Sequence, residues 1–199
     1  MILQSNQQVC GDRTESFRSP PHSVTAWDSE TIAKFDRDGE DILILDRQPL
    51  PGISEVIETT RVFDWRSDVT STSAERCAAE ALDALRISDT ELGSDIVALS
   101  RSFLAQFEVE QASLRVEVVN KQSCPKFHCD NVRIRLVTTY YGPTTEYVHN
   151  SSPEQVRSAP LFSLVFLKGH KHPGYTDTIH HRSPEVPPSR KRMCVVLDV

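Results

Sequence analysis

The residues best suited to chemistry lie in the C-terminal part of the chain. His128 and Asp130 stand two positions apart, His181 follows about fifty residues later, and Arg192 comes eleven residues after that. On a strand the first pair would share a face, because alternate residues of a strand point the same way. Two imidazoles and one carboxylate suit a divalent metal with open coordination positions, as in Fe(II) oxygenases. The spacing therefore predicts a metal site, with an arginine placed to clamp a carboxylate.

Two neighbouring residues offer alternatives for these roles. His180 could replace His181, but neighbours on a strand face opposite sides, so only one of them should be a ligand. Arg190 could replace Arg192. Because Arg192 directly begins the alternating apolar run at residues 193–197, its placement on a strand is the firmer one.

Cysteine usage bears on which metal is preferred. Cys124 lies four residues before His128 and offers a soft ligand that would favour zinc, although an inert buried thiol is its more ordinary role. We interpret His170 and His172 as residues of an exposed loop. The five cysteines are unevenly spaced and none forms a Cys-x-x-Cys pair, so we expect reduced thiols.

The elements that precede these residues are mainly helical. Residues 1–22 are polar and lack periodicity, which predicts a flexible leader. Residues 23–112 form a mainly helical N-terminal part, with helices expected at 28–39, 51–58, 73–86 and 91–107 and a buried strand at 42–45. One stripe of the last helix should pack in the core: Ile96, Leu99, Phe103, Leu104 and Phe107.

After Glu110 the apolar period changes from that of a helix to that of strands. Extended segments are expected at 113–120, 127–141, 145–149, 161–167, 175–181 and 193–199, separated by turn residues. Short strands of this kind predict a sandwich or barrel over residues 113–199, with the helical part covering one face. The fold class is therefore α+β, in one compact domain overall.

Charge and composition narrow the functional classes. Residues 1–112 carry 21 acidic and 10 basic side chains, whereas residues 113–199 carry 7 acidic and 12 basic ones. The basic C-terminal part is interpreted either as a solvated surface or as the receiver of an anionic small molecule. Basic residues do not cluster with aromatic ones, which argues against nucleic acid. With no apolar run near the roughly 20 residues of a membrane span and no signal-peptide pattern, we expect no membrane partner and a cytoplasmic location.

Further motifs of the C-terminal part are Cys124-Pro-Lys-Phe-His-Cys-Asp130, Arg135-Leu, residues 139–147, Leu167-Lys-Gly169, His181-Arg-Ser-Pro184 and residues 192–198. Together they resemble a known bacterial family of uncharacterised proteins, catalogued as domain of unknown function 1826. The similarity covers essentially the whole chain beyond the leader. Where the family usually has Gly-Pro-Gly-Thr-Glu-Trp, this chain has Gly-Pro-Thr-Thr-Glu-Tyr, with Thr144 and Tyr147 departing.

The order of these motifs is also distantly similar to the double-stranded β-helix, the jelly roll of cupins and 2-oxoglutarate oxygenases. The resemblance implies a set of site residues: His128, Asp130 and His181 as metal ligands, Arg192 as the anion clamp, Arg135 as a second cation near the site, and Thr145, Glu146 and Lys168 as candidates for the pocket wall.

Three hypotheses follow from the sequence, the third of them a β-sandwich scaffold that has lost its metal, in which His128 and His181 would pack apart. The first is a cupin-like enzyme that uses Fe(II) with 2-oxoglutarate, a dioxygenase acting on an unidentified small molecule. The second is a non-catalytic zinc-binding or zinc-homeostasis protein, because the family is associated with zinc-homeostasis gene neighbourhoods. The second predicts a closed site with Cys124 as fourth ligand and no cavity beside Arg192. No nucleophile elbow, phosphate loop or His-Glu-x-x-His helix points to a hydrolase.

Overall fold

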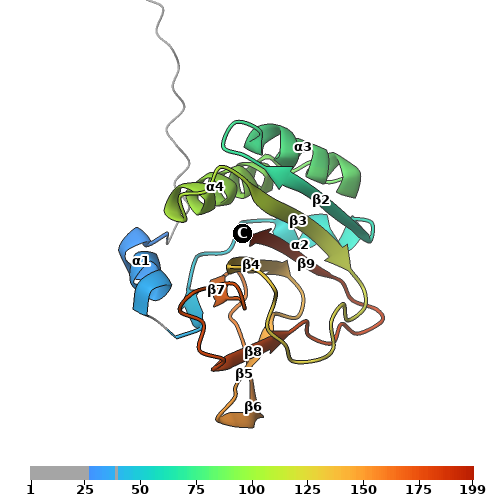
Figure 1. Cartoon of the computed structure of the whole chain (residues 1–199). Coiled ribbons are helices and arrows are strands. Elements are labelled where there is room, and N and C mark those ends of the chain that lie inside the picture. Colours follow the sequence, from blue (N-terminus) through green and yellow to red (C-terminus); the bar gives the residue numbers. More distant parts are fainter. Residues whose placement is uncertain (1–26, 39) are drawn as a thin grey trace, which may run out of the picture.

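The computed structural model describes residues 27–38 and 40–199, so the predicted leader at 1–22 lies outside the described residues. Nine strands form two antiparallel sheets in this part of the chain (Figure 1). The larger sheet has the order β1-β7-β4-β9-β3-β2, and the smaller has the order β6-β5-β8. The strands are β1 (Ile42–Leu45), β2 (Phe63–Val69), β3 (Ala112–Val119), β4 (Ile134–Tyr141), β5 (Glu146–His149), β6 (Ser152–Ser158), β7 (Leu164–Lys168), β8 (Ile179–Arg182) and β9 (Arg192–Asp198).

Four helices belong to the N-terminal part: α1 (Ser29–Asp38), α2 (Ile53–Thr59), α3 (Ala74–Leu85) and α4 (Thr90–Gln106). Asp89 caps α4 by accepting a hydrogen bond from the backbone nitrogen of Leu92 at 2.8 Å. α3 ends at Arg86, whose backbone is left-handed with φ of 61°. The stripe predicted on α4 is buried as expected. It packs with α1, α2 and α3 against one face of the larger sheet and forms the main core with it.

Strand alternation separates the larger sheet into two unlike faces. On β9, Met193, Val195 and Leu197 pack into the main core under the helices. Cys194 and Val196 point the other way, into a smaller apolar cluster that also contains Ile179 of β8. The smaller sheet therefore lies against the face of the larger sheet that the helices leave uncovered, and this second face holds the site.

The structure corrects several sequence expectations. The N-terminal part supplies both edge strands of the larger sheet, and β2 was not predicted as a strand. β6 was likewise missed. The expected strand at 127–141 is wrong in its first half, because regular pairing of β4 begins only at Ile134. His128 forms a single isolated bridge, and Asp130 lies in the loop that follows it.

Candidate metal centre

Backbone hydrogen bonds hold the two candidate histidines side by side. The nitrogen of His128 donates to the carbonyl of His181, and the nitrogen of His181 donates back to the carbonyl of His128, each at 3.0 Å. His181 itself lies on β8, where it pairs with Tyr147 of β5. This bridge anchors the loop between β3 and β4 to the smaller sheet, so the position of His128 does not depend on the loop alone.

A close backbone contact positions Asp130. Its carbonyl accepts a hydrogen bond from His170 at 2.9 Å, and the neighbouring Gly169 packs directly on this loop. A Cβ atom at Gly169 would lie 2.2 Å from the carbonyl oxygen of Val132 and 2.7 Å from that of Asp130. Only glycine allows this approach, which gives a physical reason for the glycine of the Leu-Lys-Gly motif, directly after the last residue of β7.

The three side chains converge on one point. Ligand atoms of His128, Asp130 and His181 all lie within 4.8 Å of one another. Nε2 of His181 is 2.9 Å from Oδ2 of Asp130, and Nε2 of His128 is 3.5 Å from Oδ1. An ion held about 2.1 Å from three adjacent ligand atoms of an octahedron requires separations of about 3 Å, which the two distances to Asp130 approach. The remaining separation, of up to 4.8 Å, would have to shorten when the ion binds.

Each histidine offers a nitrogen suited to a metal. Nδ1 of His128 lies 2.8 Å from the carbonyl oxygen of Lys126, which can only accept a hydrogen bond. Nδ1 therefore carries the hydrogen, and the lone pair of Nε2 is left to bind a metal. Nε2 of His181 is buried and has no partner with hydrogen-bond geometry, despite its nearness to Asp130. Burial lowers the pKa of His181, more than the Asp130 carboxylate raises it. A neutral imidazole with an unsatisfied buried nitrogen fits a metal ligand.

The carboxylate is held ionised by its surroundings. Burial alone would raise the pKa of Asp130, but His181, Arg135 and His128 lower it to about 2. Nη1 of Arg135 lies 2.5 Å from Oδ2 of Asp130, and the same guanidinium binds Asp198 through two contacts of 2.7 Å. Arg135 was predicted as a second cation near the site. Its contacts make it the residue that orients Asp130.

Arg192 lies on the face of the larger sheet that the helices leave uncovered, and it is almost fully buried, with 3% of its surface exposed. It begins β9 as predicted, whereas Arg190 is exposed in the preceding loop. Its Nη1 donates to Glu117 at 3.1 Å, and its Nη2 lies 3.2 Å from the hydroxyl of Thr145. Glu117 was not singled out from the sequence. The available signal was a glutamate two residues after Arg115 on an otherwise apolar strand.

A pocket of about 310 Å³ joins these groups. The three candidate ligands, Cys124, Thr145 and Arg192 all contribute to its wall. Five arginines also line it, against two carboxylates, Glu117 and Asp130: Arg66, Arg115, Arg135, Arg182 and Arg192. A polar pocket of this size with convergent cations suits a small organic anion.

Other predicted residues lie elsewhere. Glu146 binds Arg182 at 2.6 Å and is not among the residues that line the pocket. Lys168 lies on the helix-covered side, with its amine 5.3 Å from the centre of the Phe35 ring. His180 faces away and contacts Asp177 at 3.0 Å. His172 is buried and contacts Asp36, so its predicted exposure is wrong.

Cys124 lies beside the histidines without joining their cluster. Its sulfur is 3.6 Å from Nδ1 of His128 and 3.9 Å from Nε2. The described group of ligand atoms within 4.8 Å of one another contains His128, Asp130 and His181, and Cys124 is not part of it. The described cysteines are free thiols, as expected.

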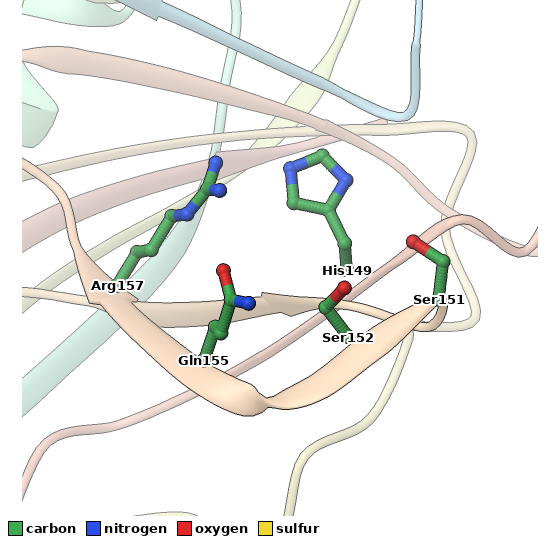
Figure 2. Close-up of a pocket in the computed structure, with 5 residues that line it drawn as sticks. All are labelled: His149, Ser151, Ser152, Gln155 and Arg157. Carbon is green, nitrogen blue, oxygen red and sulfur yellow. The ribbon is translucent and has the colours of Figure 1, made fainter.

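A second pocket, of about 250 Å³, lies on the β5–β6 hairpin (Figure 2). Figure 2 shows His149, Gln155 and Arg157 rising from the same side of the hairpin, with Ser151 and Ser152 at its turn. It shares no lining residue with the pocket beside His181.

No helix within residues 27–38 and 40–199 combines the length and apolar character needed to cross a membrane.

Comparison with solved structures shows what this architecture is similar to. The dioxygenase for auxin oxidation 1 from Arabidopsis thaliana, solved with 2-oxoglutarate, aligns with a TM-score of 0.51 at 11% identity, over 86% of this chain and 88% of that one. The rice dioxygenase for auxin oxidation also aligns at 0.51, with 9% identity, over 85% of this chain and 77% of that one. At these identities the likeness shows the fold, a double-stranded β-helix with α+β character, as predicted.

Comparison with curated protein sequences gave no match. The resemblance proposed from the sequence motifs is confirmed by a family model that matches residues 14–198. That model is described as Protein of unknown function (DUF1826), and the chain belongs to this family.

Proposed function

We propose that the protein is an Fe(II)- and 2-oxoglutarate-dependent oxygenase acting on a small molecule. The observation that carries this proposal is the convergence of His128, Asp130 and His181 in a pocket that also contains Arg192. Two imidazoles and one carboxylate leave three positions of an octahedral ion open, which is the arrangement that Fe(II) oxygenases use. Iron held in this way would supply the redox chemistry that couples decarboxylation of an oxo acid to oxidation of the substrate.

The chain's own residues have separable roles in this proposal. His128 and His181 would offer their Nε2 atoms, and burial, which lowers the pKa of His181, keeps that imidazole neutral. Asp130 would offer one carboxylate oxygen while Arg135 keeps the other. Arg192 and the hydroxyl of Thr145 would bind the distal carboxylate of the oxo acid, since charge-assisted hydrogen bonds are the strong ones in a buried site.

The fold likeness supports the proposal without establishing it. The Arabidopsis relative in fold was solved as a complex with 2-oxoglutarate, so this architecture is able to hold that oxo acid. Each of the five arginines of the pocket wall is paired with a carboxylate of the chain, so an anionic ligand would bind by competing with these ion pairs. The substrate would be a small molecule that enters the pocket beside the candidate ligands.

Turnover of 2-oxoglutarate tests the proposal. Purified protein supplied with Fe(II) and dioxygen should convert 2-oxoglutarate to succinate slowly without substrate, and the rate should rise when a substrate is found. His181→Ala should abolish this conversion, while His180→Ala should keep it, because His180 faces away from the pocket. Absence of succinate above the His181→Ala background in the wild type would contradict the proposal.

One observation favours a second candidate, a zinc-binding protein. The sulfur of Cys124 lies within 4 Å of both ring nitrogens of His128, close enough for a small shift to bring a fourth ligand to the ion. Metal analysis of protein purified without added metal separates the two. One equivalent of zinc that is lost on Cys124→Ser, together with no conversion of 2-oxoglutarate, would favour the zinc-binding protein.

A further inference from the structure

The guanidinium of Arg192 is saturated by the protein itself. Its Nε donates to the carbonyl of Pro143 at 3.1 Å. Nη1 is shared by Glu117 and the sulfur of Cys194, each at 3.1 Å. Nη2 is shared by the hydroxyls of Thr139 and Thr145, at 3.4 and 3.2 Å. An arginine has five N–H donors, and here all of its nitrogens already have acceptors.

Glu117 is the charged member of this set and is unusual for its depth. Only 2% of its surface is exposed, and one carboxylate oxygen accepts from both Arg192 and the thiol of Cys194. Its other oxygen forms an ion pair with Arg115. Burial raises the pKa of Cys194 to about 12, so its thiol stays protonated and remains a donor to Glu117.

Arg115 has a second carboxylate partner besides Glu117. Its guanidinium also binds Asp64 of β2 through two contacts, at 2.9 and 3.0 Å. Arg192, in contrast, has no second carboxylate among its partners in the described part of the chain. Glu117 is therefore the only carboxylate among the described partners of Arg192, and Arg192 shares it with Arg115.

The two threonines define what a ligand carboxylate meets. Thr145 lines the pocket and accepts from Nη2, so its own hydroxyl hydrogen is left to point elsewhere. Among the described residues no acceptor is found for that hydrogen. A ligand carboxylate would thus meet the Thr145 hydroxyl first and would reach Nη2 only by taking the place of a threonine hydroxyl, while Glu117 holds Nη1.

We infer that Glu117 is a specificity-determining residue that weakens the grip of Arg192 on the distal carboxylate of an oxo acid. This inference rests on the proposed function. A free arginine favours a dicarboxylic oxo acid over a monocarboxylic one, because it supplies an unbalanced charge and two parallel donors. With Glu117 in place, the pocket discriminates poorly between 2-oxoglutarate and 2-oxobutyrate, a monocarboxylate that presents the same oxo-acid group.

Calorimetric titration of the Fe(II)-loaded protein, with dioxygen excluded, tests this inference. The dissociation constants of 2-oxoglutarate and 2-oxobutyrate are measured for the wild type, Glu117→Gln and Glu117→Asp. The wild type should bind the two acids within about tenfold of each other, because hydrogen bonds to a charged group contribute modestly when a second carboxylate competes. Glu117→Gln should shift the ratio by about tenfold or more toward 2-oxoglutarate, since it removes a charge next to the ligand.

Glu117→Asp provides a measurement if Glu117→Gln does not fold. The shorter side chain keeps its charge but withdraws from Arg192, so the ratio should shift in the same direction by a smaller factor. A wild type that already prefers 2-oxoglutarate by about a hundredfold, the preference expected of an uncontested arginine, would overturn the inference. A ratio unchanged in both variants would overturn it too. If neither acid binds the loaded wild type, the proposed function itself fails, a different result from binding with an unchanged ratio.

Discussion

Arg135 reaches Asp130 from the larger sheet and holds it 2.5 Å from its Nη1 atom, while two further contacts tie the same guanidinium to Asp198. Asp130 lies in an irregular loop, whereas Arg135 and Asp198 are directly paired on β4 and β9. The rigid sheet therefore fixes the orientation of the one carboxylate that the loop supplies. In metal sites, such outer partners orient the ligand and are needed for full affinity.

The first prediction concerns this support. Arg135→Gln should lower metal affinity by about 10- to 100-fold, as loss of an outer partner does. It should also lower the free energy of unfolding by about 2–3 kcal/mol, because Asp130 and Asp198 lose a shared, largely buried partner. Arg133→Gln is the matched control, since Arg133 is more exposed and pairs with Asp36. Equal metal affinity in the two variants would argue against the role assigned to Arg135.

A second prediction concerns the turn that precedes β5. Gly142 has φ of +83°, and a Cβ atom there would lie 2.1 Å from the carbonyl oxygen of Lys191. Gly52 has φ of +70° but meets nothing within 4 Å. Gly52→Ala should therefore cost about 1–2 kcal/mol from backbone strain alone. Gly142→Ala should cost at least about 1–3 kcal/mol more, because the backbone before Arg192 must move.

Urea unfolding of both glycine variants measures this difference. The carbonyl of Pro143 accepts from Arg192, so Gly142→Ala should also weaken binding of 2-oxoglutarate to the metal-loaded protein. Gly52→Ala should leave that binding unchanged. Equal stability losses would show that the turn tolerates the added methyl group.

A third prediction follows from the different surroundings of two cysteines. Thiolates are the reactive form, and burial raises the pKa of Cys194 from 9.0 to about 12. Its thiol therefore stays protonated up to that pH and should resist alkylation in the folded protein. Cys124 lines the pocket and is partly exposed, so iodoacetamide should modify it first. Peptide mapping after alkylation at about pH 8 gives the order, and prior labelling of Cys194 would contradict the buried position.

The raised pKa of Cys194 also makes the free energy of unfolding depend on pH in the alkaline range. The folded-state pKa of Cys194 lies above the ordinary value of 9.0, so the folded protein binds this proton more tightly than the unfolded chain. The corresponding stability is complete below about pH 9 and is lost as the pH rises toward about 12. Cys194→Ala should flatten the decline of unfolding free energy in this range. An unchanged decline would mean that the thiol is not the group responsible.

The sequence was most informative where local signals agree with tertiary packing. α3 and α4 were predicted within two residues of their ends, because Ala and Leu at helical spacing and the Asp89 cap act locally. β2 and β6 were missed because edge strands bury little. Most residues of β6 are exposed, so no apolar alternation marks it. Such strands are defined by the strand that they pair with, which is β3 for β2 and β5 for β6.

The candidate site likewise contains residues that local sequence identifies and contacts that it does not. His128, Asp130, His181 and Arg192 were singled out as candidates from their types and order, and the structure brings the first three within 4.8 Å of one another. The contact between Arg192 and Glu117 joins residues 75 positions apart, and no local pattern predicts it. The strand argument for the His-x-Asp pair was wrong, since Asp130 lies in a loop, yet the two side chains still meet. A backbone bridge to His181 achieves what regular alternation was expected to provide.

The most direct test of the metal centre is the visible charge-transfer band that an oxo acid produces when it chelates Fe(II). Fe(II) is added without dioxygen to the wild type, His181→Ala and His180→Ala, each with 2-oxoglutarate. The band should saturate at one equivalent of iron in the wild type and in His180→Ala, and it should be absent in His181→Ala. No band in the wild type, or equal bands in all three proteins, would contradict a centre built from His128, Asp130 and His181.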